Sequence, residues 1–124
     1  MSDLVLVVED NEVNAKLVRM ILRLAGYDVL VAPTGEAALE ELKTARPRVI
    51  LTDIQMPGMD GVELARAVKR KPELVGVKVV ALTAYAMRGD RERFLSQGLD
   101  GYISKPIDPA TFPALIRDYI DRKD

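Results

Sequence analysis

Short apolar runs alternate with longer segments of helical periodicity along the whole chain. The runs cover residues 4–8, 27–31, 49–52, 78–82 and 102–104, and the second is the weakest. Apolar runs of this length, bounded by turn residues, are typical of β-strands. Their regular alternation with helical segments predicts repeated β-α units around a parallel sheet.

The spacing of apolar residues in the intervening segments predicts five helices. In the first, apolar residues at helical spacing are Val13, Leu17, Met20, Ile21 and Leu24. Gly26 follows, where glycine commonly ends a helix. A second helix carries apolar residues between 38 and 45 and ends before Pro47. A third begins after Asp60, with Glu63 completing a near capping box, and extends to about 71; a fourth covers roughly 87–97.

The last helix contains a proline that affects where it begins. Asp108 is a candidate N-cap with Pro109 at the first helical position. The apolar stripe of this helix is Phe112, Leu115, Ile116, Tyr119 and Ile120. In a regular helix, Pro113 would remove a backbone hydrogen bond at a cost of about 3 kcal/mol. The helix is therefore expected to start late or to bend.

The first, third and fourth runs are apolar at nearly every residue, which is typical of central strands covered on both faces. The second and fifth are more polar, as edge strands are. Right-handed crossovers then favour the strand order 2-1-3-4-5. We expect an α/β fold: a doubly wound, five-stranded parallel sheet of flavodoxin-like topology with five flanking helices and a crevice between strands one and three.

Three carboxylates follow the strands that border this crevice. Glu9 and Asp10 come after the first strand and Asp53 after the third. Clustered carboxylates repel one another, so the group requires a cation. Oxygen ligands without cysteine or histidine favour a hard ion, and Mg²⁺ bound by carboxylates, waters and phosphate oxygens fits best.

The same edge holds residues suited to phosphate chemistry. A carboxylate beside Mg²⁺, such as Asp53, can attack phosphorus and form an aspartyl phosphate. Thr83 and Lys105 end the fourth and fifth runs, and can contact the phosphoryl group through a hydroxyl and an ammonium. Ala84 is small enough to leave the phosphorus accessible.

Each of these residues also has an ordinary explanation. Glu9 and Asp10 could cap the following helix, and Asp53 could be a turn residue. Thr83 could simply end a strand and Lys105 could be a solvated charge. If each ordinary explanation were true, chance would have placed all of these residues at one edge of one sheet. The combination therefore favours a functional site.

Composition narrows the chemistry further. The chain has 124 residues, 48% of them hydrophobic and 30% charged, which is typical of one globular domain. It has no cysteine and no histidine, which excludes disulfides, thiolate metal sites and serine–histidine or cysteine–histidine catalysis. The net charge of −1 predicts no nucleic-acid partner, and no apolar stretch predicts membrane insertion. Without a signal region, we expect a cytoplasmic protein.

Four ordered motifs resemble those of response-regulator receiver domains of two-component signalling. They are Val-Val-Glu-Asp-Asn at 7–11, Thr-Asp-Ile-Gln-Met-Pro-Gly-Met-Asp-Gly at 52–61, Leu-Thr-Ala at 82–84 and Ser-Lys-Pro at 104–106. The resemblance covers essentially the whole chain. Within the family, the chain is most similar to stand-alone DivK-type regulators, and also resembles the receivers of hybrid kinases.

The resemblance implies a phosphorelay function. Asp53 would accept a phosphoryl group from a phosphohistidine on a histidine kinase or a histidine phosphotransfer protein. Asp10, Asp53 and the backbone carbonyl of Gln55 would bind Mg²⁺ directly, and Glu9 would bind it through a water. Such a domain promotes its own phosphorylation and dephosphorylation and is not an enzyme acting on other substrates.

The resemblance also implies a switch. Lys105 would contact the phosphoryl group and be joined to Pro106 by a cis peptide bond. Thr83 would move toward the phosphoryl group while Tyr102 rotates inward, remodelling the face of the fourth helix, fifth strand and fifth helix for a downstream protein. Taken alone, Tyr102 is an ordinary edge-strand aromatic residue.

Three other functions compete with this one. A haloacid-dehalogenase-type phosphatase would need a second acid two residues after Asp53, where Gln55 stands. A flavin-binding electron carrier would need a hydroxyl-rich phosphate loop after the first strand, where the chain is acidic. An inert pseudo-receiver conflicts with the complete acidic, threonine and lysine set. Because the last predicted helix ends near Asp124, we expect residues 1–124 to form a single receiver domain without an output domain.

Overall fold

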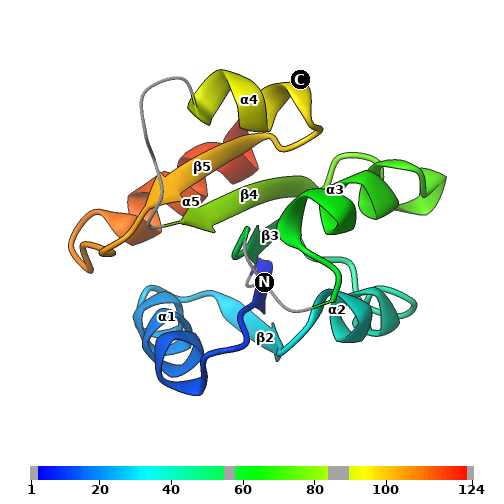
Figure 1. Cartoon of the computed structure of the whole chain (residues 1–124). Coiled ribbons are helices and arrows are strands. Elements are labelled where there is room, and N and C mark those ends of the chain that lie inside the picture. Colours follow the sequence, from blue (N-terminus) through cyan, green and yellow to red (C-terminus); the bar gives the residue numbers. More distant parts are fainter. Residues whose placement is uncertain (1–2, 55–57, 84–89, 123–124) are drawn as a thin grey trace.

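A computed structural model describes residues 3–54, 58–83 and 90–122 of the chain (Figure 1). The strands are β1 (Leu4–Val8), β2 (Asp28–Ala32), β3 (Val49–Thr52), β4 (Lys78–Thr83) and β5 (Gly101–Ser104). The helices are α1 (Glu12–Leu24), α2 (Gly35–Glu41), α3 (Gly61–Lys69), α4 (Asp90–Ser96) and α5 (Phe112–Asp121), with a short 3-10 helix η1 (Pro72–Leu74) before β4.

The strands form one parallel sheet in the order β2-β1-β3-β4-β5, which confirms the predicted topology. Val8, the last residue of β1, is paired with Thr52, the last residue of β3. At the other side of the sheet, Thr83 at the end of β4 is paired with Ser104 at the end of β5. Within each of these two pairs the strands end level, and β4 extends two residues past the end of β3, where Thr52 is paired with Ala81. The residues that follow the strands emerge at a common edge.

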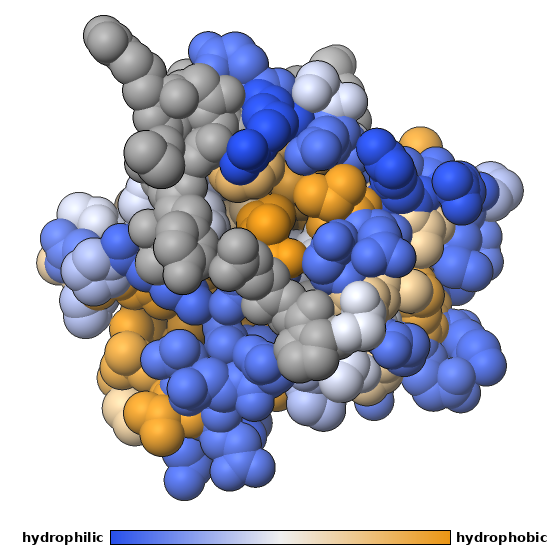
Figure 2. Space-filling view, in the orientation of Figure 1, coloured by the Kyte–Doolittle hydropathy of each residue, from blue (hydrophilic) through white to orange (hydrophobic). Residues whose placement is uncertain are grey.

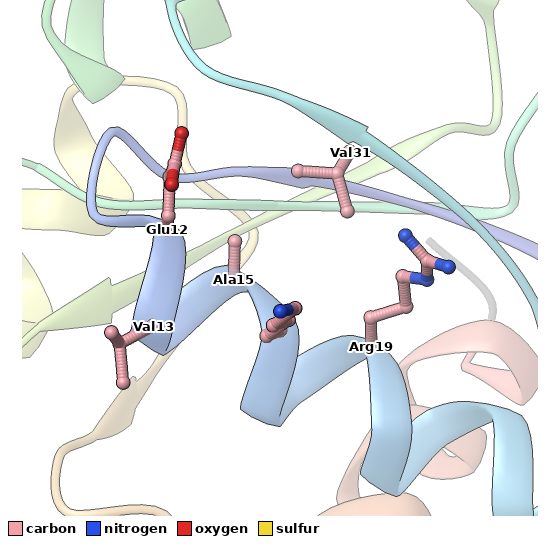
Figure 3. Close-up of a pocket in the computed structure, with 6 residues that line it drawn as sticks. Glu12, Val13, Ala15, Arg19 and Val31 are labelled. Carbon is pink, nitrogen blue, oxygen red and sulfur yellow. The ribbon is translucent and has the colours of Figure 1, made fainter.

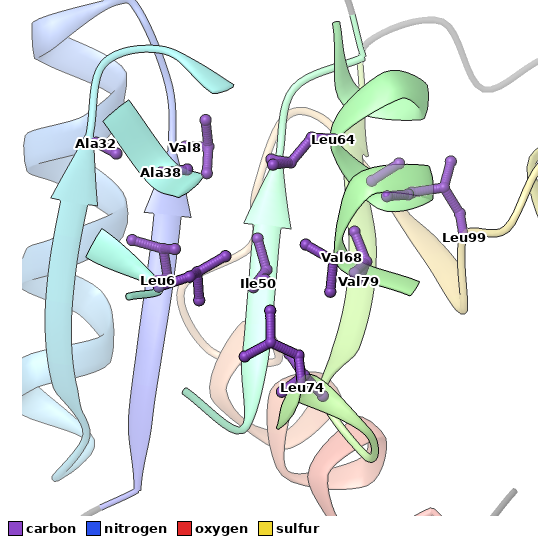
Figure 4. Packing of buried hydrophobic residues seen from close by; sticks show 14 of the residues in the cluster. Leu6, Val8, Ala32, Ala38, Ile50, Leu64, Val68, Leu74, Val79 and Leu99 are labelled. Atoms are coloured by element: carbon purple, nitrogen blue, oxygen red, sulfur yellow. The ribbon is translucent and has the colours of Figure 1, made fainter. Parts of the chain in front are cut away.

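Helices cover both faces of the sheet, so the core has two layers. α2, α3 and α4 pack on one face, where Leu6, Ile50 and Val79 of the strands meet Leu64 and others from the helices (Figure 4). α1 and α5 pack on the other face (Figure 1). Every residue of β3 and β4 is buried, whereas β2 and β5 are partly exposed, as predicted for central and edge strands.

α1 is a helix as predicted, but it buries a different face from the one that its large apolar residues suggest. Of the five apolar residues that indicated it, only Ile21 is buried. The buried positions are Ala15, Val18, Ile21 and Leu22. The helix carries apolar residues on two sides, so periodicity alone could not select the side that faces the sheet. The helix ends as predicted: Gly26 has a φ of 96°, a conformation that favours glycine.

α5 begins later than its capping residue suggested. Asp108 and Pro109 precede the helix and do not cap it: the Asp108 side chain accepts from Ala110 N at 2.9 Å, and α5 starts at Phe112. The expected late start is confirmed. Pro113 falls in the first turn, where its missing N–H costs no intrahelical hydrogen bond.

The remaining boundaries differ by small amounts. α2 ends at Glu41, before the predicted 45, and α3 ends at Lys69, before the predicted 71. The predicted start of the fourth helix near 87 lies outside the described residues, within which α4 covers Asp90–Ser96.

Candidate functional site

The carboxyl ends of β1 and β3 bring the three predicted acids together. Glu9, Asp10 and Asp53 each offer a carboxylate oxygen, and these oxygens lie within 4.8 Å of one another. Backbone hydrogen bonds continue past the strands: Glu9 N donates to Ala32 O at 3.0 Å, and Asp53 N donates to Val8 O at 3.2 Å. The sheet itself thus fixes the backbone of two of the three acids.

Gly61 sets the path of the backbone after Asp53. Its N–H donates to Ile54 O at 3.1 Å, and a β-carbon at position 61 would lie 2.6 Å from the Asp53 carbonyl oxygen. Only glycine leaves room for this approach. Asp60 and Glu63 form a complete capping box at the start of α3, so the helix end that presses on Asp53 is itself well fixed.

Glu9 is a buried acid whose two oxygens both accept hydrogen bonds. It is 4% exposed; Oε1 accepts from Asn11 N at 3.2 Å and Oε2 accepts from Lys105 Nζ at 3.2 Å. The cap of α1 is Asn11, whose side chain accepts from Val13 N and Asn14 N at 3.0 Å. The capping explanation of Glu9 and Asp10 is therefore wrong, and it leaves Asp10, which is exposed, available for other contacts.

Lys105 connects the acids of both strands. Its Nζ lies 3.2 Å from Glu9 Oε2 and 3.3 Å from Asp53 Oδ2. Its backbone N–H donates to Thr83 O at 2.8 Å, and its peptide bond to Pro106 is cis, as the resemblance implied. The lysine is placed by β5 and by the turn that follows it.

The two carboxylates keep Lys105 charged. Partial burial on its own lowers the pKa of Lys105, but the opposite charges of Asp53 and Glu9 and their hydrogen bonds outweigh it, so the pKa lies above its usual value. The side chain is therefore an ammonium at neutral pH. It partly neutralises three carboxylates that would otherwise repel one another.

The other predicted residues that the structure describes lie at the end of β4, on β5 and in the turn after β5. Thr83 is 2% exposed at the end of β4, and Pro106 is exposed. Tyr102 is half-buried on β5, with its ring edge-on to Phe94 of α4 at 6.0 Å between ring centres. Gln55 and Ala84 lie outside the described residues.

The donor set fits a hard divalent cation. Carboxylate oxygens at this separation suit Mg²⁺, which favours oxygen ligands, and the chain has no cysteine or histidine to favour a softer metal. The site therefore combines metal-compatible acids, a charged lysine and a buried strand-end threonine.

Comparison with known proteins identifies this arrangement. The sequence profile of the response regulator receiver domain matches residues 5–117. The chain belongs to this family. It is 41% identical over 116 residues to the polar-differentiation response regulator DivK of Brucella anthropi, covering 94% of each chain. It is 40% identical over 120 residues to DivK of Brucella ovis, covering 97% of this chain and 98% of that protein.

Solved structures agree with this assignment. The receiver domain of the sensor histidine kinase PA1611 from Pseudomonas aeruginosa, which has a magnesium ion coordinated in its active-site cleft, matches with a TM-score of 0.88 and 32% identity. That match covers 98% of this chain and 100% of that one. Chemotaxis protein CheY4 of Vibrio cholerae matches with a TM-score of 0.89 and 28% identity over 96% and 99% of the two chains.

Family membership places the chain in two-component phosphoacceptor signalling, in which receivers interact with kinases or phosphotransfer proteins. Family membership thus favours a receiver domain over the two alternatives from the sequence, a haloacid-dehalogenase-type phosphatase and a flavin-binding electron carrier. Among the described helices, none combines the length and apolar character needed to cross a bilayer.

Proposed function

We propose that Asp53 accepts a phosphoryl group from a phosphohistidine of a histidine kinase or histidine phosphotransfer protein, and that a further protein reads the change. The observation that carries the proposal is the position of Lys105 Nζ, 3.3 Å from Asp53 Oδ2 and 3.2 Å from Glu9 Oε2. A fixed positive charge beside a strand-end carboxylate suits phosphoryl transfer to that carboxylate.

In the transfer, an Asp53 carboxylate oxygen attacks the phosphorus. The new O–P bond forms while the P–N bond to the donor imidazole breaks, and its electron pair stays with the imidazole. Lys105 then pairs with an oxygen of the phosphoryl group, since its ammonium already lies within hydrogen-bond distance of the accepting carboxylate. The Thr83 hydroxyl donates to another of these oxygens, and Ala84, as a small residue, would leave the approach to the phosphorus open.

Asp10, Asp53 and the backbone carbonyl of Gln55 would hold Mg²⁺ directly. Glu9 would act through a water, because its two oxygens already accept hydrogen bonds from Asn11 and Lys105. When bound, the metal neutralises charge on the phosphoryl oxygens.

The domain promotes both the gain and the loss of its own phosphoryl group. In the reverse direction, the oxygen of a water attacks the phosphorus and the O–P bond to Asp53 breaks, which releases inorganic phosphate and restores the carboxylate. No external substrate is turned over, so the chain acts as a signalling domain; we assign residues 1–124 to one receiver.

The downstream protein binds the face formed by α4, β5 and α5. Thr83 ends β4 next to β5, where Tyr102 contacts Phe94 of α4. Leu95 and Leu115 are 43% and 42% exposed on α4 and α5, so they offer this face apolar contacts. A phosphoryl group of charge about −1.5 to −2 at Asp53 shifts Thr83 and Tyr102 and changes the shape of the face. Pro106 fixes the turn between Lys105 and α5.

Phosphotransfer from a purified, radiolabelled histidine kinase tests this function. The wild type should acquire label that hydroxylamine removes, as expected for an acyl phosphate, and Asp53→Asn should acquire none. Asp28→Asn is the matched control, because Asp28 is an exposed aspartate on β2, away from the acidic cluster. Equal labelling of the Asp53→Asn and wild-type chains would contradict the proposal.

A further inference from the structure

β2 forms one open edge of the sheet. Its neighbour on one side is β1, and no strand pairs with its other side in the part of the chain that the structure describes. α1 and α2 lie to either side of β2 (Figure 1). An edge strand exposes backbone N–H and C=O groups that can pair with a further strand. The outer side of β2 is therefore a surface on which another chain can be added.

The hydrogen bonds of β2 show which of its backbone groups face the open edge. Asp28 N and Ala32 O both form hydrogen bonds toward the β1 side, at 3.0 Å. In a parallel sheet, successive residues of a strand direct their backbone groups to opposite neighbours. Val29 and Val31 therefore direct their N–H and C=O groups outward. Since β2 pairs only with β1 among the described strands, these two donors and two acceptors have no strand partner.

β2 lacks the features that commonly protect an edge strand from further pairing. Such strands often carry a lysine, a proline or a bulge. The pairing of Asp28–Ala32 with β1 is continuous, and the sequence of β2 contains neither lysine nor proline. Its single charged residue, Asp28, is at the start of the strand, and Val31 is 36% exposed. The outward groups of Val29 and Val31 are thus accessible to a further strand.

A groove of about 300 Å³ lies along this edge, between α1 and Val31 (Figure 3). Ala15 and Val31 give it an apolar floor, and Arg19 points into it beside Val31. Val13 points away from the groove, so the outer apolar side of α1 is a separate surface (Figure 3). Side chains of an extended strand alternate between the two faces of a sheet. A strand added to β2 would therefore place every second side chain in this groove.

The charges of the groove indicate which strand fits. Lys16 and Arg19 line it and are exposed, and neither has an ion pair among the described residues. α1 connects two parallel strands and so runs antiparallel to β2, which places Arg19 toward the start of β2 and Glu12 toward its end. At the position of α1, hydrophilic surface borders an apolar area (Figure 2). The groove thus favours an apolar side chain over Val31 and a carboxylate two residues away, beside Arg19.

A second copy of this chain does not suit the edge. In a symmetric pair of β2 strands, the two α1 helices would lie next to each other, because they cover the same face of the joined sheet. Lys16, Arg19 and Arg23 line the grooves on this side of α1, with Glu12 as the single carboxylate. Two helices with this excess of positive charge repel each other. An acidic segment of another protein meets no such repulsion.

We propose that the open edge of β2 binds an extended acidic segment of another protein, which adds a sixth strand to the sheet. Backbone hydrogen bonds to Val29 and Val31 supply most of the affinity, and the groove with Arg19 selects the sequence of the segment. The binding goes beyond the proposed phosphoacceptor function and does not depend on it, because neither Asp53 nor Lys105 takes part.

The probe is the peptide acetyl-Thr-Lys-Thr-Val-Thr-Glu-Thr-amide. Paired antiparallel to β2, it places its valine opposite Val31, its glutamate opposite Val29 beside Arg19, and its lysine toward Glu12. The control peptide, acetyl-Thr-Lys-Thr-Val-Thr-Lys-Thr-amide, lacks the carboxylate. In ¹H–¹⁵N spectra of the labelled chain, the probe should shift the signals of β2 and α1 in a saturable way. The control peptide should bind about threefold more weakly or worse.

Hydrogen exchange distinguishes the addition of a strand from binding to α1 alone. The N–H of Leu30 faces β1 and is protected in the free chain, whereas the N–H groups of Val29 and Val31 should exchange fast. Near saturation with the probe, exchange at Val29 and Val31 should slow about fivefold or more, and exchange at Leu30 should change little.

Two pairs of variants separate the backbone contact from the charge contact. Val31→Pro removes an outward donor and keeps the hydrogen bonds to β1, so it should abolish the shifts, whereas Val31→Thr should bind within about twofold of wild type. Arg19→Glu should weaken binding of the probe about threefold or more. Arg66→Glu changes the net charge equally at an exposed position on α3 and should bind within about 1.5-fold of wild type.

Three results would overturn the inference. They are unchanged exchange at Val29 and Val31 with about 5 mM probe, equal binding of the two peptides, and equal binding by Arg19→Glu and Arg66→Glu. Protection of Val29 and Val31 that rises with protein concentration, without any peptide, would instead assign the edge to a second copy. Shifts confined to α1, without protection of these two amides, would show that no strand is added.

Discussion

Lys105 is the residue on which the electrostatics of the site depend. Its ammonium lies between Glu9 and Asp53, and Glu9 is only 4% exposed. Without this charge, Glu9 would be a buried carboxylate with a single described hydrogen bond, from Asn11 N. An uncompensated buried charge of this kind destabilises a fold.

Lys105→Met keeps the volume of the side chain and removes its charge. We expect the free energy of unfolding to fall by about 1–3 kcal/mol at neutral pH. Because the carboxylates raise the pKa of Lys105, the stabilisation is complete below the usual lysine pKa of 10.5 and is lost as the pH rises through the higher, folded value. Urea unfolding of the wild type and of Lys105→Met, measured from pH 7 to strongly alkaline pH, should show this difference in the free energy of unfolding at pH 7 and its loss at the alkaline end. A constant difference, or none at pH 7, would contradict the ion-pair assignment.

The charged residues of the site were predictable from the sequence, but the residues that hold the neighbouring backbone in place were not. Asp53 and Lys105 could be placed because parallel strands end at a common edge. Asn11 and Gly61 escaped prediction for different reasons. Asn11 follows Asp10, both residue types commonly cap helices, and the sequence does not choose between them. The close approach at Gly61 depends on the tertiary path of α3 past Asp53.

At the scale of elements, the entry of α3 controls the position of Asp53. Gly61 and Gly35 both occupy the first helical position after a cap, at Asp60 and Thr34. The nearest atoms to a β-carbon at position 35 are those of the Met59 side chain, of which Cγ and Sδ at 2.9 Å can move by a rotamer change and Cβ at 3.0 Å moves only with a small shift of the loop. At position 61 it would meet backbone, which cannot move without displacing Asp53.

Gly61→Ala and Gly35→Ala are therefore a matched pair. We expect Gly61→Ala to lower the free energy of unfolding by about 1–3 kcal/mol and to slow labelling by acetyl phosphate, since overpacking shifts the backbone at the acceptor. Gly35→Ala should change stability by less than about 1 kcal/mol and leave labelling unchanged. Urea unfolding and the labelling rate measure the two effects. Equal effects of the two substitutions would show that α3 does not position Asp53.

Whether a segment is a helix or a strand could be predicted better than which side of a helix is buried. The strands follow from apolar runs, because a strand buried on both faces needs little else. In α1, Leu17 and Leu22 are both large and apolar, and only the packed sheet shows that Leu22 is buried while Leu17 is exposed. The start of α5 could be narrowed only to a late one, because Asp108 has the same local pattern whether it caps a helix or, as here, an isolated turn.

At the scale of the whole molecule, the two helices of the proposed output face are held differently. α5 is tied to the sheet through Tyr27, whose hydroxyl donates to Pro113 O at 3.4 Å, and through Arg117, which pairs with Asp3 at 2.8 Å. α4 is short and packs through Phe94, which contacts Tyr102. We therefore expect a change at Asp53 that moves Tyr102 to act first on α4.

Beryllofluoride, a stable mimic of the aspartyl phosphate, allows this to be observed. With Mg²⁺ present, backbone amide shifts should change most at the site and around Phe94 and Tyr102, and little along α2 and β2. The comparison is between ¹H–¹⁵N spectra of the wild type and of Asp53→Asn, which should not respond. Changes confined to residues that touch Asp53 would contradict an output face at α4, β5 and α5.

The strand order was predictable because right-handed crossovers leave few alternatives once central and edge strands are known. The exposure of Val13, Leu17, Met20 and Leu24 on α1 was not, because apolar residues at helical spacing predict burial.

The most direct test of the central claim is mass spectrometry of the intact chain after incubation with acetyl phosphate and Mg²⁺. We expect a mass increase of one phosphoryl group in the wild type, dependent on Mg²⁺, located at Asp53 by peptide mapping and absent from Asp53→Asn. Modification of another residue, or an unmodified wild-type chain, would contradict the account.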